Sequence, residues 1–349
     1  MRNLPDNNTR ANNHALNLVK KCILLTALTV VVILAIYFLV PDYLQKVAWG
    51  LSILFYIILL LRMILSFLIR SKKNGFHIIV NIIYLIVASM AFIIIVIQVL
   101  APSVMFYTYF AEDAYCDLME VPTAEEITIQ TEQGILSGWF LHNADKGAPL
   151  ILYFGGNAEN SATRILRLVN TPEDLETFSG YNIAFIDYPG YGKSDGSPTD
   201  TSLKQYGLTV YDTLAARDDV SDIIVFAFSI GTGVGNYVSF QRPVHKLILF
   251  APYADGVDLY NNYLNVFYGP LKSLVTYHME AVKYAESIQV APLIIASKTD
   301  KIVSYKSSVR LSEAYPLGNR FITLEGIGHN DIWKTPSVLM EVKKYLSEE

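Results

Sequence analysis

Cysteine is scarce in this chain: only Cys22 and Cys116 occur among its 349 residues. Cys22 lies in an apolar segment and Cys116 stands alone. We therefore expect no intramolecular disulfide, and neither residue has the setting of a metal ligand or a nucleophile. Charged residues are also few, at 17%, and the net charge is −5. A chain without surplus positive charge lacks the electrostatic attraction that draws proteins to nucleic acid, so we expect no such partner.

Apolar residues are abundant instead: they make up 52% of the chain, and the mean hydropathy is +0.33. Three runs carry much of this excess, at residues 22–40, 47–69 and 76–101. Each is long enough to cross a hydrocarbon core about 30 Å thick at about 1.5 Å per residue. A cleaved signal peptide accounts for the first run only, and the runs lack the one-sided pattern of buried core helices. We predict three transmembrane helices behind a tail of residues 1–21.

Lysine and arginine orient these predicted helices in the membrane. Basic residues gather in residues 2–21, before the first run, and in residues 70–73, between the second and third. The loop between the first two runs holds only Lys46, and the third run is followed by no basic residue until Lys146. The positive-inside rule therefore predicts a cytoplasmic N-terminus and an extracytoplasmic location for everything after about residue 102.

Residues 102–124 are predicted to link the membrane module to the C-terminal part of the chain. They contain no lysine or arginine, and their first half is rich in aromatic residues. Aromatic side chains favour the boundary between lipid and water. We therefore expect an anchor at the outer interface, made by Phe106, Tyr107, Tyr109 and Phe110.

Residues 125–349 alternate short apolar strands with helical patterns. Two alternating runs around residues 132–134 predict an opening hairpin. Later strands are expected at 150–154, 183–186, 223–228, 246–250, 293–297 and 320–324, and helices at 160–169, 203–216, 234–240 and 337–346. This order predicts an α/β fold, a mostly parallel sheet with helices on both faces. Ligands of such sheets bind beyond the carboxyl ends of the strands.

A candidate nucleophile follows one of these strands, in the run F-A-F-S-I-G at 226–231. Ser229 stands at an expected sharp turn from strand to helix, with small residues two positions before and after it. Such a strained turn tolerates only small neighbours and lifts the serine oxygen above the sheet, as in the nucleophile elbow of serine hydrolases. The usual pattern is G-x-S-x-G, and Ala227 replaces its first glycine. A Ser-x-Gly after a strand also occurs by chance, so the prediction depends on finding a base and an acid.

Both partners occur at later strand ends. Asp300 follows the strand at 293–297, and His329 follows the strand at 320–324. A histidine can take the serine proton near neutral pH, and a carboxylate fixes its tautomer and stabilises the imidazolium. Asp255 is an alternative acid. Taken alone, Asp300 is also explained as a turn residue and His329 as the start of a helix. The chain order Ser, Asp, His nevertheless favours a triad.

The loop after the strand at 150–154 is the candidate for half of an oxyanion hole. A hole of this kind combines the N–H of the residue after the nucleophile, here Ile230, with one N–H from that loop. We assign the second donor to Asn157 and expect Gly156 to lie against substrate. The alternative, a phosphate-binding glycine loop, lacks the required lysine.

Three strings carry a resemblance to a known family: G-G-N-A-E-N at 155–160, D-Y-P-G-Y-G-K-S-D-G-S-P at 187–198, and G-H-N-D at 328–331. Residues 125–349 resemble the α/β-hydrolase superfamily. They are most similar to its membrane-tethered serine hydrolases, whose loops read H-G-N-A-G-N, D-Y-P-G-Y-G-x-S-x-G-x-P and G-H-N-D. The first string departs from the family at Gly155, where those hydrolases have histidine. The resemblance implies the α/β-hydrolase fold for this region and does not extend to the three apolar runs.

Residues 253–287 form a connection longer than usual and are predicted to be a cap. Its many aromatic residues suit an apolar acyl chain, and we expect Tyr253 and Phe267 to contact it. Packing of the cap onto the sheet explains the same residues equally well.

Sequence thus predicts a membrane-anchored serine hydrolase of esters or thioesters, acting on lipid or acylated substrates without metal or organic cofactor. The alternatives are a peptidase or acyltransferase with the same triad, and a non-catalytic lipid-binding or membrane-assembly protein.

Overall fold

The computed structural model describes residues 20, 57, 106–108, 111–263 and 265–348. The chain divides into two units, residues 1–103 and 104–349, and nearly all described residues belong to the second. The three predicted transmembrane runs lie outside the described residues, apart from Ile57. Within the part of the chain that the structure describes, no helix combines the length and the apolar character needed to cross a bilayer.

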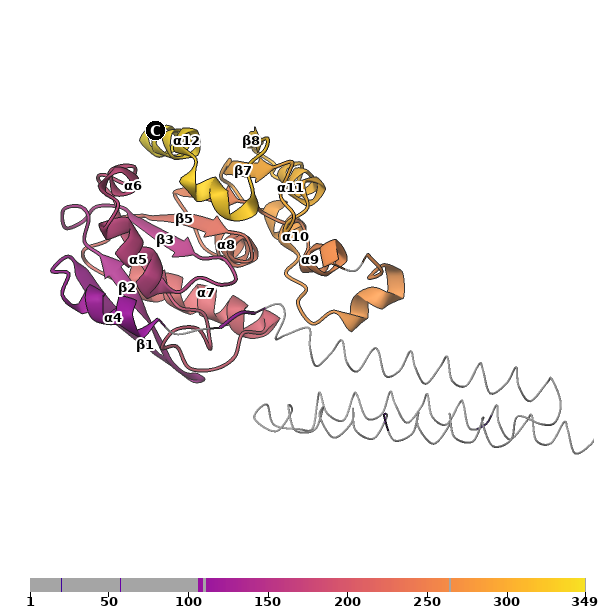
Figure 1. Ribbon diagram of the computed structural model, residues 1–349, viewed down its shortest axis with the longest axis horizontal. Helices are drawn as coiled ribbons and strands as arrows, with labels where there is room; N and C mark the ends of the chain where they lie inside the picture. Colours follow the sequence, from indigo (N-terminus) through magenta and orange to yellow (C-terminus); the bar gives the residue numbers. More distant parts are fainter. Residues whose placement is uncertain (1–19, 21–56, 58–105, 109–110, 264, 349) are drawn as a thin grey trace, which may run out of the picture. The chain divides into compact units, whose positions relative to one another are not determined.

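An eight-stranded sheet forms the centre of the second unit, in the order β1-β2-β4-β3-β5-β6-β7-β8 (Figure 1). β1 and β2 form the predicted antiparallel hairpin, and β2 also pairs antiparallel with β4. All other pairs are parallel. The strands are β1 (Ala124–Thr131), β2 (Gly134–Leu141), β3 (Leu150–Phe154), β4 (Asn182–Ile186), β5 (Ile223–Phe228), β6 (Lys246–Phe250), β7 (Leu293–Ser297) and β8 (Arg320–Leu324). The predicted mostly parallel sheet is confirmed.

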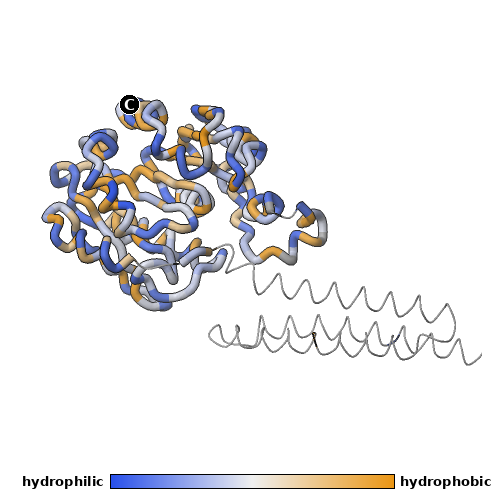
Figure 2. The backbone as a smooth tube through the Cα atoms, in the orientation of Figure 1, coloured by the Kyte–Doolittle hydropathy of each residue, from blue (hydrophilic) through white to orange (hydrophobic). Residues whose placement is uncertain are grey.

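Burial explains why the inner strands read as continuous apolar runs. Every residue of β3, β4, β5, β6 and β7 is buried, because helices cover the sheet on both faces. Strands buried on both faces gain from apolar side chains at every position rather than at alternate ones. The tube in Figure 2 accordingly carries much of its hydrophobic colour along the interior strands.

Helices connect the strands and pack on one another in pairs. α4 packs on α5, α7 packs on α8, and α8 also contacts α10. Their bounds are α4 (Glu112–Met119), α5 (Ser161–Val169), α6 (Pro172–Glu176), α7 (Asp200–Ala215), α8 (Gly231–Gln241), α9 (Gly256–Tyr263), α10 (Ala281–Ala285), α11 (Tyr305–Ser312) and α12 (Pro336–Ser347), with the 3₁₀ helices η1 (Gly269–Leu274) and η2 (His329–Lys334). Asn160 begins α5 by accepting a hydrogen bond from the Thr163 N–H at 2.9 Å.

The segment assigned to a linker, residues 102–124, contains α4 and a residue of the core. Phe106 is buried, and its ring meets that of Tyr277 edge to face, with the centroids 5.6 Å apart. Tyr107 has 63% of its surface exposed. The expectation that Phe106 is an exposed anchor at a membrane interface is therefore wrong, because its ring is buried against Tyr277, in the segment predicted to be a cap. Tyr109 and Phe110 lie outside the described residues.

Candidate active site

Ser229 lies between β5 and α8 with a backbone φ of 53°, in the left-handed region that non-glycine residues rarely adopt. Two hydrogen bonds hold this turn. The Ser229 N–H donates to the Phe250 carbonyl at 2.9 Å, and the Thr232 hydroxyl donates to the Ser229 carbonyl at 2.6 Å. The neighbouring strand and the first turn of α8 thus stabilise a conformation that costs about 1–3 kcal/mol.

Close backbone contacts explain the small residues on either side of the serine. A Cβ on Gly231 would lie 2.5 Å from the Gly155 carbonyl oxygen and would also meet the Phe154 carbonyl, so no other residue fits there. Ala227 is fully buried, and a Cβ built on Gly235 would lie 2.9 Å from the Cβ of Ala227. Alanine is accepted at 227 because glycine at 235 leaves it room.

The structure brings Ser229, His329 and Asp300 together in one hydrogen-bonded chain. His329 Nε2 lies 2.9 Å from Ser229 Oγ, and His329 Nδ1 lies 2.6 Å from Asp300 Oδ2. The His329 and Asp300 side chains are 6% and 2% exposed. An ionised carboxylate can only accept, so Nδ1 carries the proton and Nε2 is left to accept the serine O–H. The carboxylate of Asp255, the alternative acid, instead accepts from the Val257 N–H at 2.9 Å and pairs with Lys272 at 3.9 Å.

Loops after β7 and β8 hold the acid and the base. The second oxygen of Asp300 accepts the N–H groups of Ile302 at 2.7 Å and Val303 at 2.9 Å. The hydroxyl groups of Ser297 and Thr299 both donate to the Ile327 carbonyl, at 2.6 and 2.9 Å. The loop carrying Asp300 is thereby tied to the loop carrying His329, which fixes the distance between the two side chains.

Two backbone donors stand free beside this arrangement. Among the described residues, no acceptor pairs with the N–H of Ile230 or with the N–H of Asn157, the two predicted oxyanion-hole donors. The Asn157 side chain is fixed, because its Oδ1 accepts from the Tyr107 N–H at 2.7 Å and the Tyr191 hydroxyl at 2.9 Å. The loop therefore has one immobilised side chain and one available backbone donor.

The three predicted substrate contacts each have a defined partner in the structure. The Gly156 N–H donates to the Glu159 carboxylate at 2.7 Å. Tyr253 is fully buried, and its hydroxyl donates to the Ile230 carbonyl at 3.1 Å. Phe267 is also buried, and its ring meets that of Tyr260 with the centroids 5.9 Å apart. That Gly156, Tyr253 and Phe267 contact substrate stays a prediction.

The loop at 187–198, which sequence analysis gave no catalytic role, supports the candidate oxyanion loop. Asp187 accepts from the Ser161 N–H at 2.6 Å and the Ser161 hydroxyl at 2.8 Å, and burial raises the pKa of its carboxyl to about 7. The Tyr188 hydroxyl donates to the Gly155 carbonyl at 2.8 Å. In the sequence, the glycine-rich string at 187–198 indicated this supporting role, because its tight turns position the Asp187 and Tyr188 side chains.

Within the described ranges, no group of three or more His, Cys, Asp or Glu side chains could hold a metal ion.

No protein-family profile matches the chain, but individual proteins resemble it in sequence. It is 26% identical over 234 residues to an uncharacterised protein of Mycobacterium tuberculosis, covering 65% of this chain and 81% of that protein. It is 25% identical over 232 residues to alpha/beta hydrolase domain-containing protein 17C of Xenopus laevis (66% and 72%). Over 123 residues it is 29% identical to the lysophosphatidylserine lipase ABHD12 of Gallus gallus (34% and 31%).

Solved structures share the fold. The Pyrococcus furiosus esterase Pf2001 superposes with a TM-score of 0.54, at 18% identity, over 69% of this chain and 97% of its own. At this level of identity the match shows the fold, and the chemistry depends on the residues described above.

Proposed function

We propose that this chain, an α/β-hydrolase by fold and by resemblance, is a membrane-anchored serine hydrolase that cleaves carboxylic esters or thioesters. One observation carries the proposal: the hydrogen-bonded chain Ser229–His329–Asp300 lies at the strand ends of a hydrolase sheet. Nothing in the packing of the sheet requires all three side chains, whereas acyl transfer requires each of them.

In the proposed reaction, Ser229 Oγ attacks the acyl carbonyl while His329 Nε2 takes the hydroxyl proton. The carbonyl π electrons move to oxygen, and the N–H groups of Ile230 and Asn157 stabilise the resulting oxyanion. When the oxyanion collapses, the bond to the alcohol or thiol breaks and His329 returns its proton to the leaving group. Water then attacks the acyl-enzyme by the same steps and releases the acid.

Lipid or acylated substrates fit the proposal best. One relative is named a lysophosphatidylserine lipase, and one of the solved structures with this fold is named an esterase. The region from 253 to 287 contributes several buried aromatic residues, which suit an apolar acyl chain near the site.

Substrate choice is the direct test of the proposed function. Purified full-length protein in detergent would be offered p-nitrophenyl esters from acetyl to palmitoyl, a lysophospholipid, and a soluble peptide amide. We expect ester turnover that includes chains beyond a few carbons, with free acid as the product. Cleavage of the peptide without turnover of any ester longer than a few carbons would contradict the proposal. Transfer of the acyl group to an added alcohol in preference to water would identify an acyltransferase instead.

The membrane anchor and the side on which the domain lies form part of the proposal. The three apolar runs before residue 102 would span the bilayer and leave residues 125–349 outside the cytoplasm. Cys116, which is exposed on α4, offers the test. In intact cells it should react with a membrane-impermeant maleimide, and the Cys116→Ser variant should not. Labelling that requires permeabilised cells would place the domain on the cytoplasmic side.

A further inference from the structure

Glu159 makes a set of contacts that the proposed reaction leaves unexplained. One carboxylate oxygen, Oε2, accepts from the Gly156 N–H at 2.7 Å and from the Tyr153 hydroxyl at 2.7 Å. The Glu159 N–H in turn donates to the Gly156 carbonyl at 3.3 Å. Side chain and backbone of one residue thus close the turn that carries Asn157, the candidate oxyanion donor.

This loop departs at two positions from the string of the hydrolases that the chain resembles. Their string H-G-N-A-G-N has histidine and glycine at the first and fifth positions, where this chain has Gly155 and Glu159. A Cβ on Gly155 would lie 3.0 Å from Glu159 Oε2 and 2.6 Å from Phe185 Cζ. A side chain at 155 would meet both the Phe185 ring and the Glu159 carboxylate, so Gly155 leaves room for both.

We propose that Glu159 is a positioning residue for the oxyanion hole, because its carboxylate holds the loop that carries the Asn157 N–H. The peptide group between Gly155 and Gly156 is held at both ends: Tyr188 donates to its carbonyl at 2.8 Å, and its N–H donates to Glu159. Fixing that peptide fixes the next one, whose N–H is that of Asn157. The proposal rests on the proposed function, because it names how the hole of that reaction is held.

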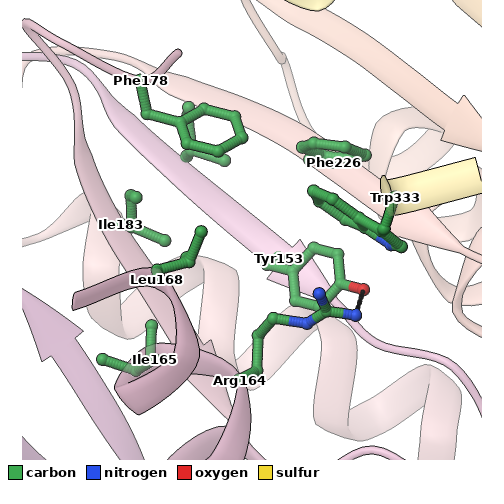
Figure 3. A pocket seen from close by; sticks show the side chains of 9 residues that line it. Tyr153, Arg164, Ile165, Leu168, Phe178, Ile183, Phe226 and Trp333 are labelled. Atoms are coloured by element: carbon green, nitrogen blue, oxygen red, sulfur yellow. Dashed lines mark hydrogen bonds between the residues drawn. The ribbon is translucent and has the colours of Figure 1, made fainter. Parts of the chain in front are cut away.

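Arg164 makes a carboxylate acceptable at this position. It forms an ion pair with Glu159, and its side chain is 9% exposed. Figure 3 shows its guanidinium beside the Tyr153 hydroxyl and close to Trp333, whose ring lies 4.5 Å from Arg164 Cζ. Trp333 belongs to η2, the helix that begins at His329. The pair therefore joins the oxyanion loop to the element that carries the base.

The charges of Glu159 and Arg164 determine how this ion pair affects the oxyanion. An unpaired carboxylate near the hole would repel the negative charge that develops on the substrate oxygen, and a buried environment strengthens that repulsion. Paired with Arg164, it can hold the Gly156 N–H without this penalty. Loss of the hydrogen bond and loss of the counter-ion should therefore both lower kcat, for different reasons.

Three variants of the full-length protein test the hydrogen bond, with a p-nitrophenyl ester as substrate. Glu159→Ala should lower kcat about 10–100-fold with KM within about threefold, because a displaced donor acts on the transition state and one lost donor costs about 10²–10³-fold. Glu159→Gln keeps an acceptor oxygen and should recover kcat to within about fivefold of wild type. Glu176→Gln, which removes an exposed ion pair with Lys343, is the matched control and should leave kcat unchanged. Wild-type kcat in Glu159→Ala, or equal losses in the alanine and glutamine variants, would overturn the proposal.

The counter-ion supplies a second test that does not depend on how well Glu159→Ala folds. Arg164→Met should lower kcat at pH 8, because it leaves the Glu159 carboxylate without its counter-ion. Adding Glu159→Gln to Arg164→Met should restore part of kcat at pH 8, and a double variant no better than Arg164→Met would overturn the proposal.

The Ser229→Ala variant distinguishes failure of this inference from failure of the proposed function. If wild-type turnover requires Ser229 while the Glu159 variants behave as wild type, this inference fails alone; if turnover does not require Ser229, the proposed function fails with it.

Discussion

Replacing Ser229 with alanine should reduce the turnover of an acyl ester by at least about 10⁴-fold, with the fold retained. The expectation follows from geometry: Ser229 Oγ is the oxygen that His329 Nε2 reaches, at 2.9 Å, and its N–H and carbonyl, which hold the turn, belong to the backbone. Alanine keeps those backbone bonds and removes only the nucleophile. The measurement is the steady-state rate of ester hydrolysis by purified full-length protein in detergent.

Ser239 provides the matched control for that substitution. It lies on α8, which begins after the elbow, and its buried hydroxyl has no hydrogen-bond partner among the described residues. Ser239→Ala therefore removes a hydroxyl group from the same helix without removing a contact, and kcat should stay within about twofold of wild type. A Ser229→Ala variant as active as Ser239→Ala would rule out Ser229 as the nucleophile.

Asp300→Asn should lower kcat about 10⁴-fold, the loss found when the acid of a serine triad becomes an amide. The carboxylate accepts the Nδ1 proton at 2.6 Å and so leaves Nε2 free to take the serine proton. An asparagine amide can donate to Nδ1 instead, which favours the tautomer with its proton on Nε2. That tautomer cannot accept from Ser229, so attack is lost while the side chain keeps its size.

Asp331→Asn tests whether this loss is specific. Asp331 lies two residues after His329, but its carboxylate is 57% exposed and pairs with Lys334 at 2.9 Å. The substitution should change kcat less than about threefold, because it leaves His329 and its partners in place. If Asp300→Asn retains wild-type kcat and Asp255→Asn loses it, the acid has been assigned to the wrong residue.

Much of this fold could be predicted from sequence because its inner strands have a recognisable pattern. Inner strands buried on both faces must be apolar throughout, so five-residue runs such as 150–154 and 293–297 mark them with bounds that the structure reproduces. The hairpin of β1 and β2 follows from alternation around one glycine, Gly134, which has a φ of 121°. The resemblance to the α/β-hydrolase superfamily, stated from three loop strings, is confirmed by the relatives and the fold.

The supports of the site were harder to predict, because they depend on contacts between distant residues. Phe106 packs on Tyr277, and Tyr253 reaches the Ile230 carbonyl, although sequence shows only that each is aromatic. An aromatic residue in a cap fits both a buried packing role and a substrate contact, and sequence cannot separate the two. Glu159 was missed for another reason: its partner Gly156 is only three residues away, but a glutamate in a loop is usually solvated.

The most direct test of the central claim is labelling with a fluorophosphonate probe, which reacts with a serine only when a base activates it. Full-length wild-type protein in detergent and the Ser229→Ala variant would be compared at equal concentration, with matching thermal unfolding as proof of fold. We predict stoichiometric labelling of the wild type and none of the variant. Labelling that persists in Ser229→Ala, or folded wild type that takes up no probe, would contradict the account.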